Sequence, residues 1–249
     1  MYSDVHIGPV TIHMYGLMIA VGFVVGYLIA DYRAKKKGLC QDIVLGILWC
    51  AVIGGFVGAR VLYYIVSYKD IMKDISILWD FANGYVVYGG ILGGVFAGYI
   101  YIRRKQERFL RYFDLMVPSI ALAQGFGRIG CFFAGCCYGR ETGLPIGIVF
   151  KHSNYAPNGV SLMPTQLISS AGDFLIAFIL LFYGRKRRAD GSIGGLYMIL
   201  YSIGRFSIEY LRNDYRGSVL GLSTSQIISI VVLLGGAILE IVSLSKKIE

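Results

Sequence analysis

Charged residues are scarce in this sequence. Only 16% of its 249 residues are Asp, Glu, Lys or Arg, against about 25% in an ordinary soluble domain. With 5 prolines and 5 cysteines, the chain is neither collagen-like nor a disulfide-stapled mini-protein. Hydrophobic residues make up 56% and the mean hydropathy is +0.62, which excludes a disordered chain. A water-soluble domain of this composition would expose much apolar surface, so the sequence indicates a protein that lies in lipid.

Seven windows are long and apolar enough to cross a membrane as helices. A spanning helix needs roughly 20 mostly apolar residues, and backbone groups cannot stay unpaired in lipid. The windows are 10–30, 43–66, 85–102, 113–133, 165–183, 194–211 and 224–244. We therefore expect an all-α fold, a polytopic membrane helix bundle of seven transmembrane helices that forms one integral-membrane domain over residues 1–249. The longest connection would then be residues 134–164.

Acidic residues are outnumbered by basic ones, 15 to 24, which gives a net charge of +9. In a soluble protein this excess would suggest nucleic acid, but here most basic residues lie in alternate connections, the pattern of the positive-inside rule. They are Arg33, Lys35, Lys36, Lys37, Arg103, Arg104, Lys105, Arg108, Arg111, Arg185, Lys186, Arg187, Arg188, Lys246 and Lys247. We therefore place the N-terminus outside the cell and the C-terminus in the cytoplasm. No basic residue precedes the first window, so we do not expect a cleavable signal peptide there.

Glycine is abundant, with 33 residues, and several glycines recur at a spacing of four within the windows. They are Gly22 and Gly26, Gly54 and Gly58, and Gly90, Gly94 and Gly98. Small residues at this spacing let helix backbones approach closely, so we interpret them as packing residues without a chemical role.

With this orientation, the polar residues of all seven windows fall in the outer part of the membrane. A charged group in lipid costs about 2.5–3.5 kcal/mol, so such groups usually face an interior cavity. The residues that share this depth are His13, Tyr15, Arg60, Tyr88, Gln124, Arg128, Thr165, Gln166, Arg205, Glu209, Arg212 and Gln226.

Arginine dominates this outer layer. Arg205, Glu209 and Arg212 are spaced i, i+4 and i+7, which would place them on one helix face. That face could be an internal ion pair that only closes the bundle, but such a pair leaves Arg60 and Arg128 without a counter-charge. Guanidinium groups suit phosphate and stay charged when buried. The sequence therefore predicts that an anionic lipid, or a small phosphate compound, binds near the outer face.

Six motifs stand in a fixed order along the chain. They are His13-Met-Tyr-Gly-Leu-Met18, Gly58-Ala-Arg-Val61, Tyr88-Gly-Gly-Ile-Leu-Gly-Gly94, Gly125-Phe-Gly-Arg-Ile-Gly-Cys131 with Gly135 and Gly139-Arg140 after it, Pro164-Thr-Gln166, and Tyr201-Ser-Ile-Gly-Arg-Phe-Ser-Ile-Glu-Tyr-Leu-Arg212. Together they resemble the prolipoprotein diacylglyceryl transferase family. The resemblance covers residues 11–229, nearly the whole chain. The stretches around Arg128 and from Arg205 to Arg212 are specific, whereas His-x-Tyr-Gly alone would be weak.

The resemblance implies an enzyme of the bacterial plasma membrane that transfers a diacylglyceryl group from phosphatidylglycerol to the lipobox cysteine thiol of a prolipoprotein. The products would be a thioether and glycerol phosphate, and the partners would be the bilayer, phosphatidylglycerol and the signal-peptide region of the precursor. In the family, the arginines matching Arg128 and Arg205 bind headgroup and phosphate, where they would stabilise the leaving group. Other residues expected to bind substrate or shape the site are His13, Tyr15, Arg60, Gly139, Gln166, Glu209, Arg212 and Gln226. No cofactor and no nucleic acid are expected.

The chain departs from the family pattern at several positions. Tyr88 stands where the family usually has a histidine that is often treated as the base. Cys131 replaces the usual asparagine, and Cys136 replaces an acid or similar polar residue. Met163 stands where a histidine usually precedes the Pro-Thr-Gln motif.

Tyr88 is the predicted catalytic residue most affected by these departures. A free tyrosine has a pKa of about 10 and a free histidine about 6.5, so the phenol is the poorer base near neutral pH. A nearby arginine could lower the pKa of Tyr88, or the substrate thiol could ionise beside Arg128 and Arg205 without a strong base. Tyr88 could instead be an interfacial tyrosine with no part in the chemistry.

Cys131, Cys136 and Cys137 form a cluster at the outer end of the fourth window. Three clustered thiols could form a disulfide, bind a soft metal or simply pack. Zinc takes four ligands and the only local histidine is His152, so we expect packing or a disulfide rather than a metal site. Because they replace polar residues of the family's site, Cys131 and Cys136 are also candidate substrate contacts.

Two other functions remain open from the sequence. The chain could be a divergent relative, in which cysteines replace polar site residues and the acceptor or the donor differs. It could also be a non-enzymatic protein that binds or transports an anionic lipid, although the two halves show no pairing of broken helices.

Overall fold

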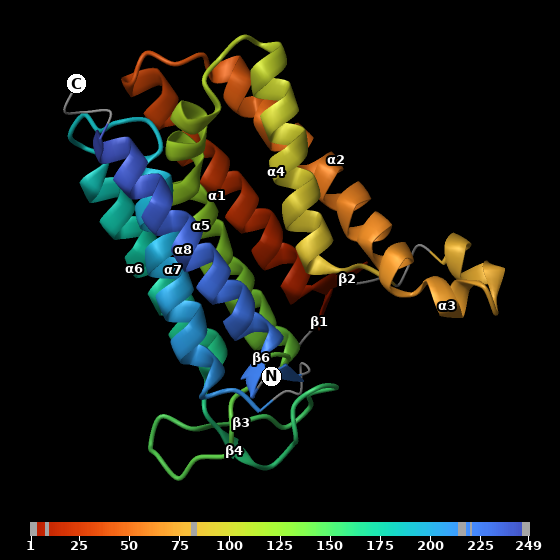
Figure 1. The fold of residues 1–249 in the computed structure, drawn as a ribbon. Helices are drawn as coiled ribbons and strands as arrows, with labels where there is room; N and C mark the ends of the chain where they lie inside the picture. Colours follow the sequence, from red (N-terminus) through yellow and green to blue (C-terminus); the bar gives the residue numbers. More distant parts are fainter. Residues whose placement is uncertain (1–3, 8–9, 81–83, 214–217, 220, 246–249) are drawn as a thin grey trace. The chain divides into compact units, whose positions relative to one another are not determined.

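A computed structural model describes residues 4–7, 10–80, 84–213, 218–219 and 221–245, and these are mostly helical (Figure 1). Lys246 and Lys247, on which part of the predicted topology rests, lie outside the described residues. The helices are α1 (Met14–Lys36), α2 (Gln41–Val66), α3 (Tyr68–Ile71), α4 (Val87–Arg104), α5 (Phe109–Ala134), α6 (Thr165–Tyr183), α7 (Ser192–Glu209) and α8 (Thr224–Ser245), with a 3₁₀ helix η1 (Ile75–Trp79). The strands form antiparallel hairpins: β1 (Asp4–Ile7) with β2 (Val10–His13), β3 (Ile148–Val149) with β4 (Ser161–Leu162), and β5 (Ser218–Val219) with β6 (Leu222–Ser223).

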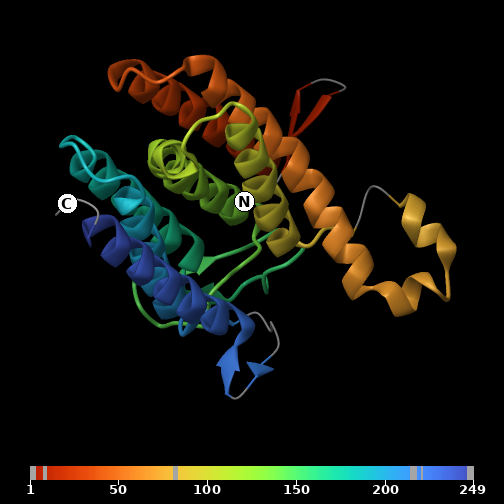
Figure 2. The same cartoon turned by 45° about the horizontal axis from the view of Figure 1, so that its top comes forward.

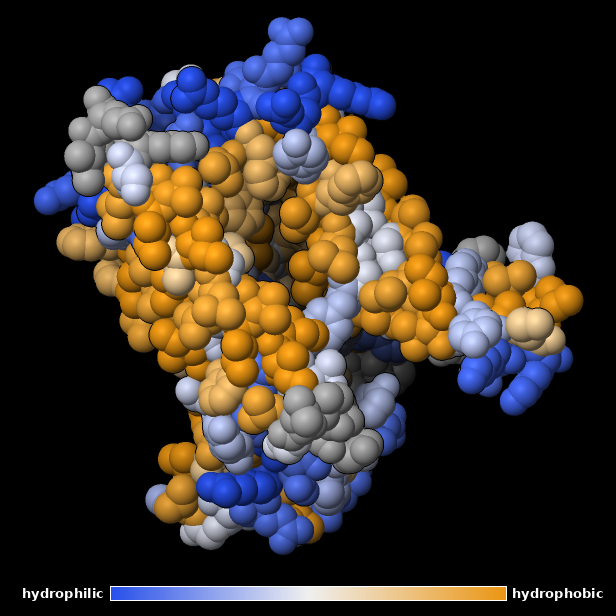
Figure 3. Space-filling model, viewed as in Figure 1, coloured by the Kyte–Doolittle hydropathy of each residue, from blue (hydrophilic) through white to orange (hydrophobic). Residues whose placement is uncertain are grey.

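Five of these helices are long and apolar enough to cross a membrane, namely α1, α2, α5, α6 and α8. Their large apolar side chains point outward rather than into a core. In α8, Val231, Leu234, Ile238 and Ile241 recur on one face and are each 58–64% exposed. Figure 3 shows the visible helix faces covered with apolar side chains along much of their length. Lipid is the solvent that suits such surfaces, which confirms a mostly helical membrane protein.

The first predicted window begins too early. Its first residues form β2 (Val10–His13) rather than a helix, so α1 starts at Met14 and His13 is a strand residue. Val10, Thr11 and Ile12 are β-branched, and such residues favour strands over helices.

The sixth predicted window ends too late. Helix α7 stops at Glu209, and the backbone of Arg212 forms an isolated antiparallel bridge with Gly139. Arg205 and Glu209 therefore share a helix face as predicted, but the placement of Arg212 on that face is wrong. A Cβ at Gly139 would lie 2.6 Å from the Met163 carbonyl oxygen, so the bridge requires glycine.

The chain divides into a larger unit (Met1–Ala30 and Phe113–Glu249) and a smaller unit (Asp31–Tyr112). The larger unit holds α6, α7, α8, almost all of α5 and the first part of α1, and Figures 1 and 2 show α6, α7 and α8 side by side. Its apolar core is built mainly from α5, α6 and α7, and consists of Val117, Ala121, Ile176, Ala177, Leu180 and Ile193.

Glycines bring helices of the larger unit into close contact. A Cβ at Gly22 or Gly26 of α1 would lie 3.2 Å from a carbonyl oxygen of α5, that of Ala123 or Ser119. These contacts confirm that Gly22 and Gly26 are packing residues.

Helices α5 and α7 end where α6 and α8 begin, and this end of the larger unit carries most of its predicted polar residues. The opposite end holds a second polar cluster that the sequence analysis did not foresee. Asp114 of α5 is buried and accepts hydrogen bonds from the backbone nitrogens of Gly191 (2.8 Å) and Gly194 (2.7 Å) at the start of α7. Glu240 of α8 accepts a bond from the Ser192 hydroxyl (3.0 Å) beside it. The expectation that all intramembrane polar residues share one depth is therefore wrong.

In the smaller unit, α2 and α4 pack through glycines. A Cβ at Gly54 would lie 2.7 Å from the Gly93 carbonyl oxygen, and one at Gly58 would meet the Gly89 carbonyl oxygen still more closely. The predicted small-residue packing is confirmed here too, since any larger side chain would push the two backbones apart.

Candidate functional site

Two arginines from different helices line one cavity in the larger unit. Arg128 lies in the last turns of α5 and Arg205 in the last turns of α7, and the cavity has a volume of about 300 Å³. Asp173 of α6 and Tyr201 of α7 also line it. The remaining wall is largely aliphatic and includes Ile168, Ile176, Ile208 and Leu211. The cavity thus joins a cationic part to an apolar part.

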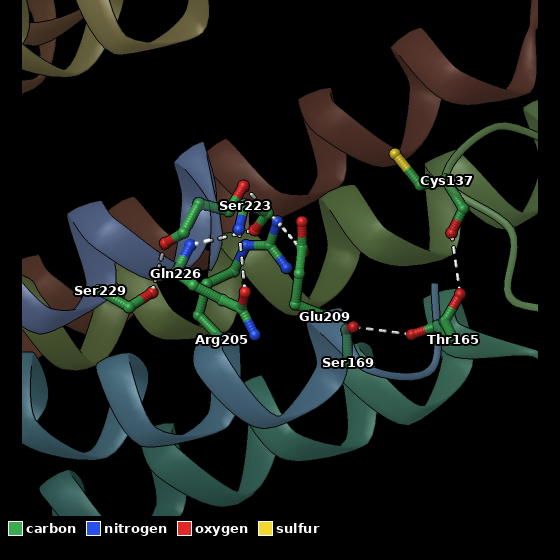
Figure 4. Close-up of polar contacts among 9 residues, drawn as sticks. Cys137, Thr165, Ser169, Arg205, Glu209, Ser223, Gln226 and Ser229 are labelled. Atoms are coloured by element: carbon green, nitrogen blue, oxygen red, sulfur yellow. Dashed lines mark hydrogen bonds and ion pairs between the residues drawn. The ribbon is translucent and has the colours of Figure 1, made fainter. Parts of the chain in front are cut away.

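Arg205 is held by two neighbours, and one of its donor groups has no hydrogen-bond partner in the part of the chain that the structure describes. Its Nη2 atom lies 2.6 Å from a carboxylate oxygen of Glu209 (Figure 4) and donates to the Ser225 hydroxyl at 2.7 Å. Its Nη1 atom is buried and has no hydrogen-bond partner among the described residues. A buried guanidinium nitrogen is costly to leave unpaired, so this atom is suited to an acceptor that the described residues do not supply.

Asp173 is the residue that the sequence analysis missed. It is the only acid within the predicted window 165–183, and its side chain is buried against the cavity within electrostatic range of Arg128. An ionisable residue inside a membrane span is by itself a functional-site signal. With Asp173 included, Arg128, Arg205 and Arg212 face two carboxylates rather than one.

Tyr15 lies beside the Arg128 region, as predicted for a site residue. Its ring sits against Gly130, where an added Cβ would be 3.1 Å from the ring. Its phenol is within electrostatic range of Arg128 and of the three clustered cysteines. His13, two residues earlier, is the last residue of β2, and its side chain is exposed.

Cys131, Cys136 and Cys137 are not joined by disulfide bonds, and their sulfur atoms all lie within 4.8 Å of one another. Cys131 is in the last turn of α5, and the chain then turns back through Gly135 (φ +73°) and Cys137 (φ +58°). These left-handed conformations fold the two later cysteines toward the first. Of the two expected alternatives, packing or a disulfide, the structure shows no disulfide among these three cysteines, and the predicted proximity of the thiols is confirmed.

The first two residues of α6 fix the backbone of this cysteine turn. The Thr165 hydroxyl donates to the Cys137 carbonyl oxygen at 2.8 Å (Figure 4), and the Gln166 amide donates to the Cys136 carbonyl oxygen at 2.8 Å. Gln166 is buried, and its own Oε1 atom has no hydrogen-bond partner in the part of the chain that the structure describes.

Arg212 contacts the cysteine cluster through Cys137. Hydrogen bonds from the neighbouring thiols of Cys131 and Cys136, together with the Arg212 guanidinium, hold the pKa of the Cys137 thiol well below its usual range.

Gln226 has a local structural partner. Its Oε1 atom accepts from the Ser223 backbone nitrogen at 3.0 Å, and the Gln226 nitrogen donates to the Ser223 hydroxyl at 3.2 Å (Figure 4). This reciprocal pair is a capping box that starts α8, and α8 carries the Ser225 hydroxyl that holds Arg205.

Two predicted site residues, Arg60 and Tyr88, belong to the smaller unit. The Arg60 side chain is buried and donates to the Tyr64 hydroxyl at 2.7 Å and to the carbonyl oxygens of Ile77, Leu78 and Gly84 at 3.1–3.3 Å. Arg60 thus ties α2 to the connection that follows it, which agrees with a role in shaping rather than in binding phosphate. Tyr88 is the second residue of α4 and is 39% exposed.

A second hollow, of about 380 Å³, lies at the surface of the connection between α5 and α6. It is lined by Glu141, Thr142 and Ser161 among others, and it includes no basic side chain. We therefore take the Arg128–Arg205 cavity as the site.

Comparison with known proteins bears on what this site does. Residues 4–242 match the model of the prolipoprotein diacylglyceryl transferase family. The chain is 48% identical to the phosphatidylglycerol–prolipoprotein diacylglyceryl transferase of Clostridium tetani over 225 residues, which is 90% of each chain. The chain belongs to the prolipoprotein diacylglyceryl transferase family. It is also 47% identical over 229 residues to transferase 2 of Clostridium perfringens (92% of this chain, 90% of the relative) and 38% identical over 240 residues to the transferase of Clostridioides difficile (96% and 93%).

Membership of the prolipoprotein diacylglyceryl transferase family confirms the resemblance drawn from the motifs and makes the protein a transferase of lipoprotein biosynthesis. The matched residues contain both cavity arginines, Asp173 and the cysteine cluster. The cavity therefore lies in the part of the chain that defines the family.

Proposed function

We propose that this transferase moves a diacylglyceryl group from phosphatidylglycerol to the lipobox cysteine thiol of prolipoproteins. The sulfur attacks the glycerol carbon that carries the phosphate ester, a thioether forms, and glycerol phosphate leaves. The relatives named above carry both substrates in their names, and the chain covers about nine-tenths of them.

The observation that carries this proposal is the cavity with Arg128 and Arg205 in its wall and an unpartnered Arg205 Nη1 atom. Three guanidinium groups in this region, with Arg212 included, face the carboxylates of Asp173 and Glu209. The planar donor groups of these guanidiniums suit the oxygens of a phosphodiester, and they stay charged when buried. The arginines of the cavity wall are thus suited to a phospholipid headgroup.

The same arginines favour the reaction and not only binding. When the carbon–oxygen bond breaks, the phosphate gains a second negative charge. Guanidinium donors that are already fixed by Glu209 and Ser225 need no reorganisation to stabilise that charge, and a cavity shielded from water strengthens the effect. The aliphatic wall residues Ile168, Ile176 and Ile208 are suited to the start of the acyl chains.

The proposed function also requires a particular arrangement of the chain in the membrane. We place seven helices across a bacterial plasma membrane as one integral-membrane domain, with the N-terminus outside. The cavity then opens in the outer half of the bilayer, where the signal-peptide region of a precursor presents its cysteine. Within the larger unit, the basic residues Arg185–Arg188 follow the C-terminal end of α6, whereas the cavity arginines lie toward the N-terminal end of α6. Because basic connections face the cytoplasm, this arrangement supports a cavity on the outer side.

Complementation of a bacterium depleted of its own transferase tests the function. Expression of this chain should restore lipidation of a reporter prolipoprotein, seen as a mass increase of one diacylglyceryl group on its cysteine. A reporter with Ser in place of that cysteine serves as the control. Membrane insertion without any lipidation of the reporter would contradict the proposal and favour a lipid-binding protein. Modification of a different acceptor would indicate that the chain is a divergent relative of the family with another substrate.

A further inference from the structure

Three thiols stand beside the lipid-binding arginines, and the function described so far does not use them. The sulfur atoms of Cys131, Cys136 and Cys137 lie within 4.8 Å of one another. In a tetrahedral zinc site with Zn–S bonds of about 2.3 Å, the sulfur atoms are about 3.8 Å apart. Small inward movements of the three sulfur atoms would therefore bring them to the separation of three ligands on one zinc ion.

The backbone that carries these thiols is fixed as a metal site requires. Cys131 is on α5, and the turn that carries the other two thiols is bound to the start of α6 by Thr165 and Gln166. The buried Oε1 atom of Gln166, which has no hydrogen-bond partner within the described residues, can accept from a molecule that binds at the cluster. The ligands are thus held by residues around them, as is usual for metal-binding side chains.

We propose that Cys131, Cys136 and Cys137 bind a zinc ion whose fourth ligand is the cysteine thiol of the prolipoprotein. In the described part of the chain no carboxylate or imidazole joins the three thiols, so one position of the tetrahedron stays open. Three protein ligands and one open position are typical of catalytic zinc, whereas structural zinc has four protein ligands. The proposal replaces the expectation of no metal, which assumed that all four ligands must come from the protein.

The electrostatics of the site suit such an ion. Zinc with three thiolates carries one negative charge, and the substrate thiolate adds a second. Arg128 lies one helical turn before Cys131, and Arg212 contacts Cys137, so two guanidinium groups offset these charges. The open position of the zinc is thereby placed next to the cavity in which Arg128 and Arg205 hold the lipid phosphate.

The inference rests on the proposed transfer and supplies its nucleophile. On binding zinc, the acceptor thiol releases its proton to water and becomes a thiolate. The thiolate lone pair forms the C–S bond to the glycerol carbon, and the C–O bond to phosphate breaks, with its electron pair leaving on glycerol phosphate. The thioether product is a weaker ligand than a thiolate and leaves the zinc. A strong side-chain base is then unnecessary for forming the thiolate.

The test measures metal binding apart from activity. Protein purified in detergent with zinc supplied should hold about one zinc ion per chain. Cys131→Ser, Cys136→Ser or Cys137→Ser should each weaken zinc binding at least about a hundredfold, whereas Cys50→Ser in the smaller unit should not change it. With Co²⁺ as the probe, the wild-type protein should show a thiolate-to-cobalt band. This band should grow when a lipobox peptide is added, but not when its cysteine is replaced by Ser.

Two results would overturn the zinc proposal. One is purified wild-type protein that transfers the lipid while holding no zinc and giving no cobalt band. The other is a cobalt band whose intensity does not change when the lipobox peptide is added. Neither result would contradict the proposed transfer of the diacylglyceryl group. Conversely, a protein that binds zinc and the peptide thiol but never lipidates a precursor would contradict the proposed function and leave the metal site standing.

Discussion

At the scale of single residues, the site depends on a few guanidinium groups with fixed neighbours. Arg205 is the clearest case, because its Nη2 atom is held by Glu209 and Ser225, whereas its Nη1 atom has no hydrogen-bond partner among the described residues. Such an arrangement needs a planar group with several donors in fixed directions. Lysine keeps the charge but lacks this fork.

We expect Arg205→Lys to lower kcat/KM for diacylglyceryl transfer by about a hundredfold, because one ammonium group cannot serve Glu209, Ser225 and the phosphate together. Arg205→Ala and Arg128→Ala should abolish transfer while the protein still inserts in the membrane. Rates measured in proteoliposomes, with Arg187→Lys as the control, check this. Wild-type turnover by Arg128→Ala would remove the headgroup role from that residue.

Tyr88→Phe separates two accounts of proton transfer. If the phenol handles a proton, its loss should slow transfer by about a hundredfold. If zinc activates the acceptor thiol, the Phe variant should remain within a few-fold of the wild type. Single-turnover rates with a fixed precursor peptide distinguish these outcomes, and Tyr99→Phe in the same helix is the matched control.

The sequence analysis succeeded where a residue's type and position were enough. Arg128, Arg205 and Glu209 were predicted from charge in an apolar window, and the structure brings them together. Asp173 was not predicted, because this acid lies in the middle of its helix and the predicted polar residues lie near the ends of their windows. The use of Gln226 as a helix cap could be read from Ser-x-x-Gln at the start of α8, but the residue was taken for a substrate contact.

At the scale of elements, the long helices follow from hydropathy, and the errors lie at their ends. Helix α1 starts four residues later than the window 10–30 because the β-branched residues before it pair as a strand. The end of α7 depends on the bridge between Arg212 and Gly139, two segments far apart in the sequence. No local pattern reports such a long-range pair, and helix boundaries are generally less certain than helix existence.

The packing of α2 on α4 gives a prediction at this scale. Gly93→Ala would bring a Cβ against the Gly54 carbonyl oxygen. Because that oxygen is a backbone atom, only a shift of the helix backbones can relieve the clash. We expect this variant to lose several degrees of thermal stability in detergent. Gly98→Ala in the same helix meets only the Ile47 side chain, at 3.9 Å, and should be neutral or slightly stabilising. Equal melting temperatures for the two variants would contradict the packing argument.

At the scale of the whole molecule, the sequence predicted a membrane protein from composition alone, and exposed apolar helix faces agree. The positive-inside rule predicts the direction of the chain across the membrane. It gives a prediction that depends on neither the site nor the metal.

A cysteine placed at Ser153, in the connection between α5 and α6, should react with a membrane-impermeant maleimide in intact cells. A cysteine at Arg187, after the end of α6, should react only after the cells are permeabilised. Both variants are made in a background with the five natural cysteines changed to Ser. Labelling in the reverse order would invert the topology and place the cavity on the cytoplasmic side.

The buried carboxylate of Asp114 has a consequence for how the arginines are held. It joins α5 to the first turn of α7 at the end remote from the cavity. Fourteen residues separate Asp114 from Arg128, and the same number separates Gly191 from Arg205, a rise of about 21 Å along each helix. Both guanidinium groups are therefore set at equal height from a shared anchor, and sliding of one helix along the other would break the two bonds of that anchor. The anchor therefore keeps the spacing of the two cations constant, whether or not a ligand occupies the cavity between them.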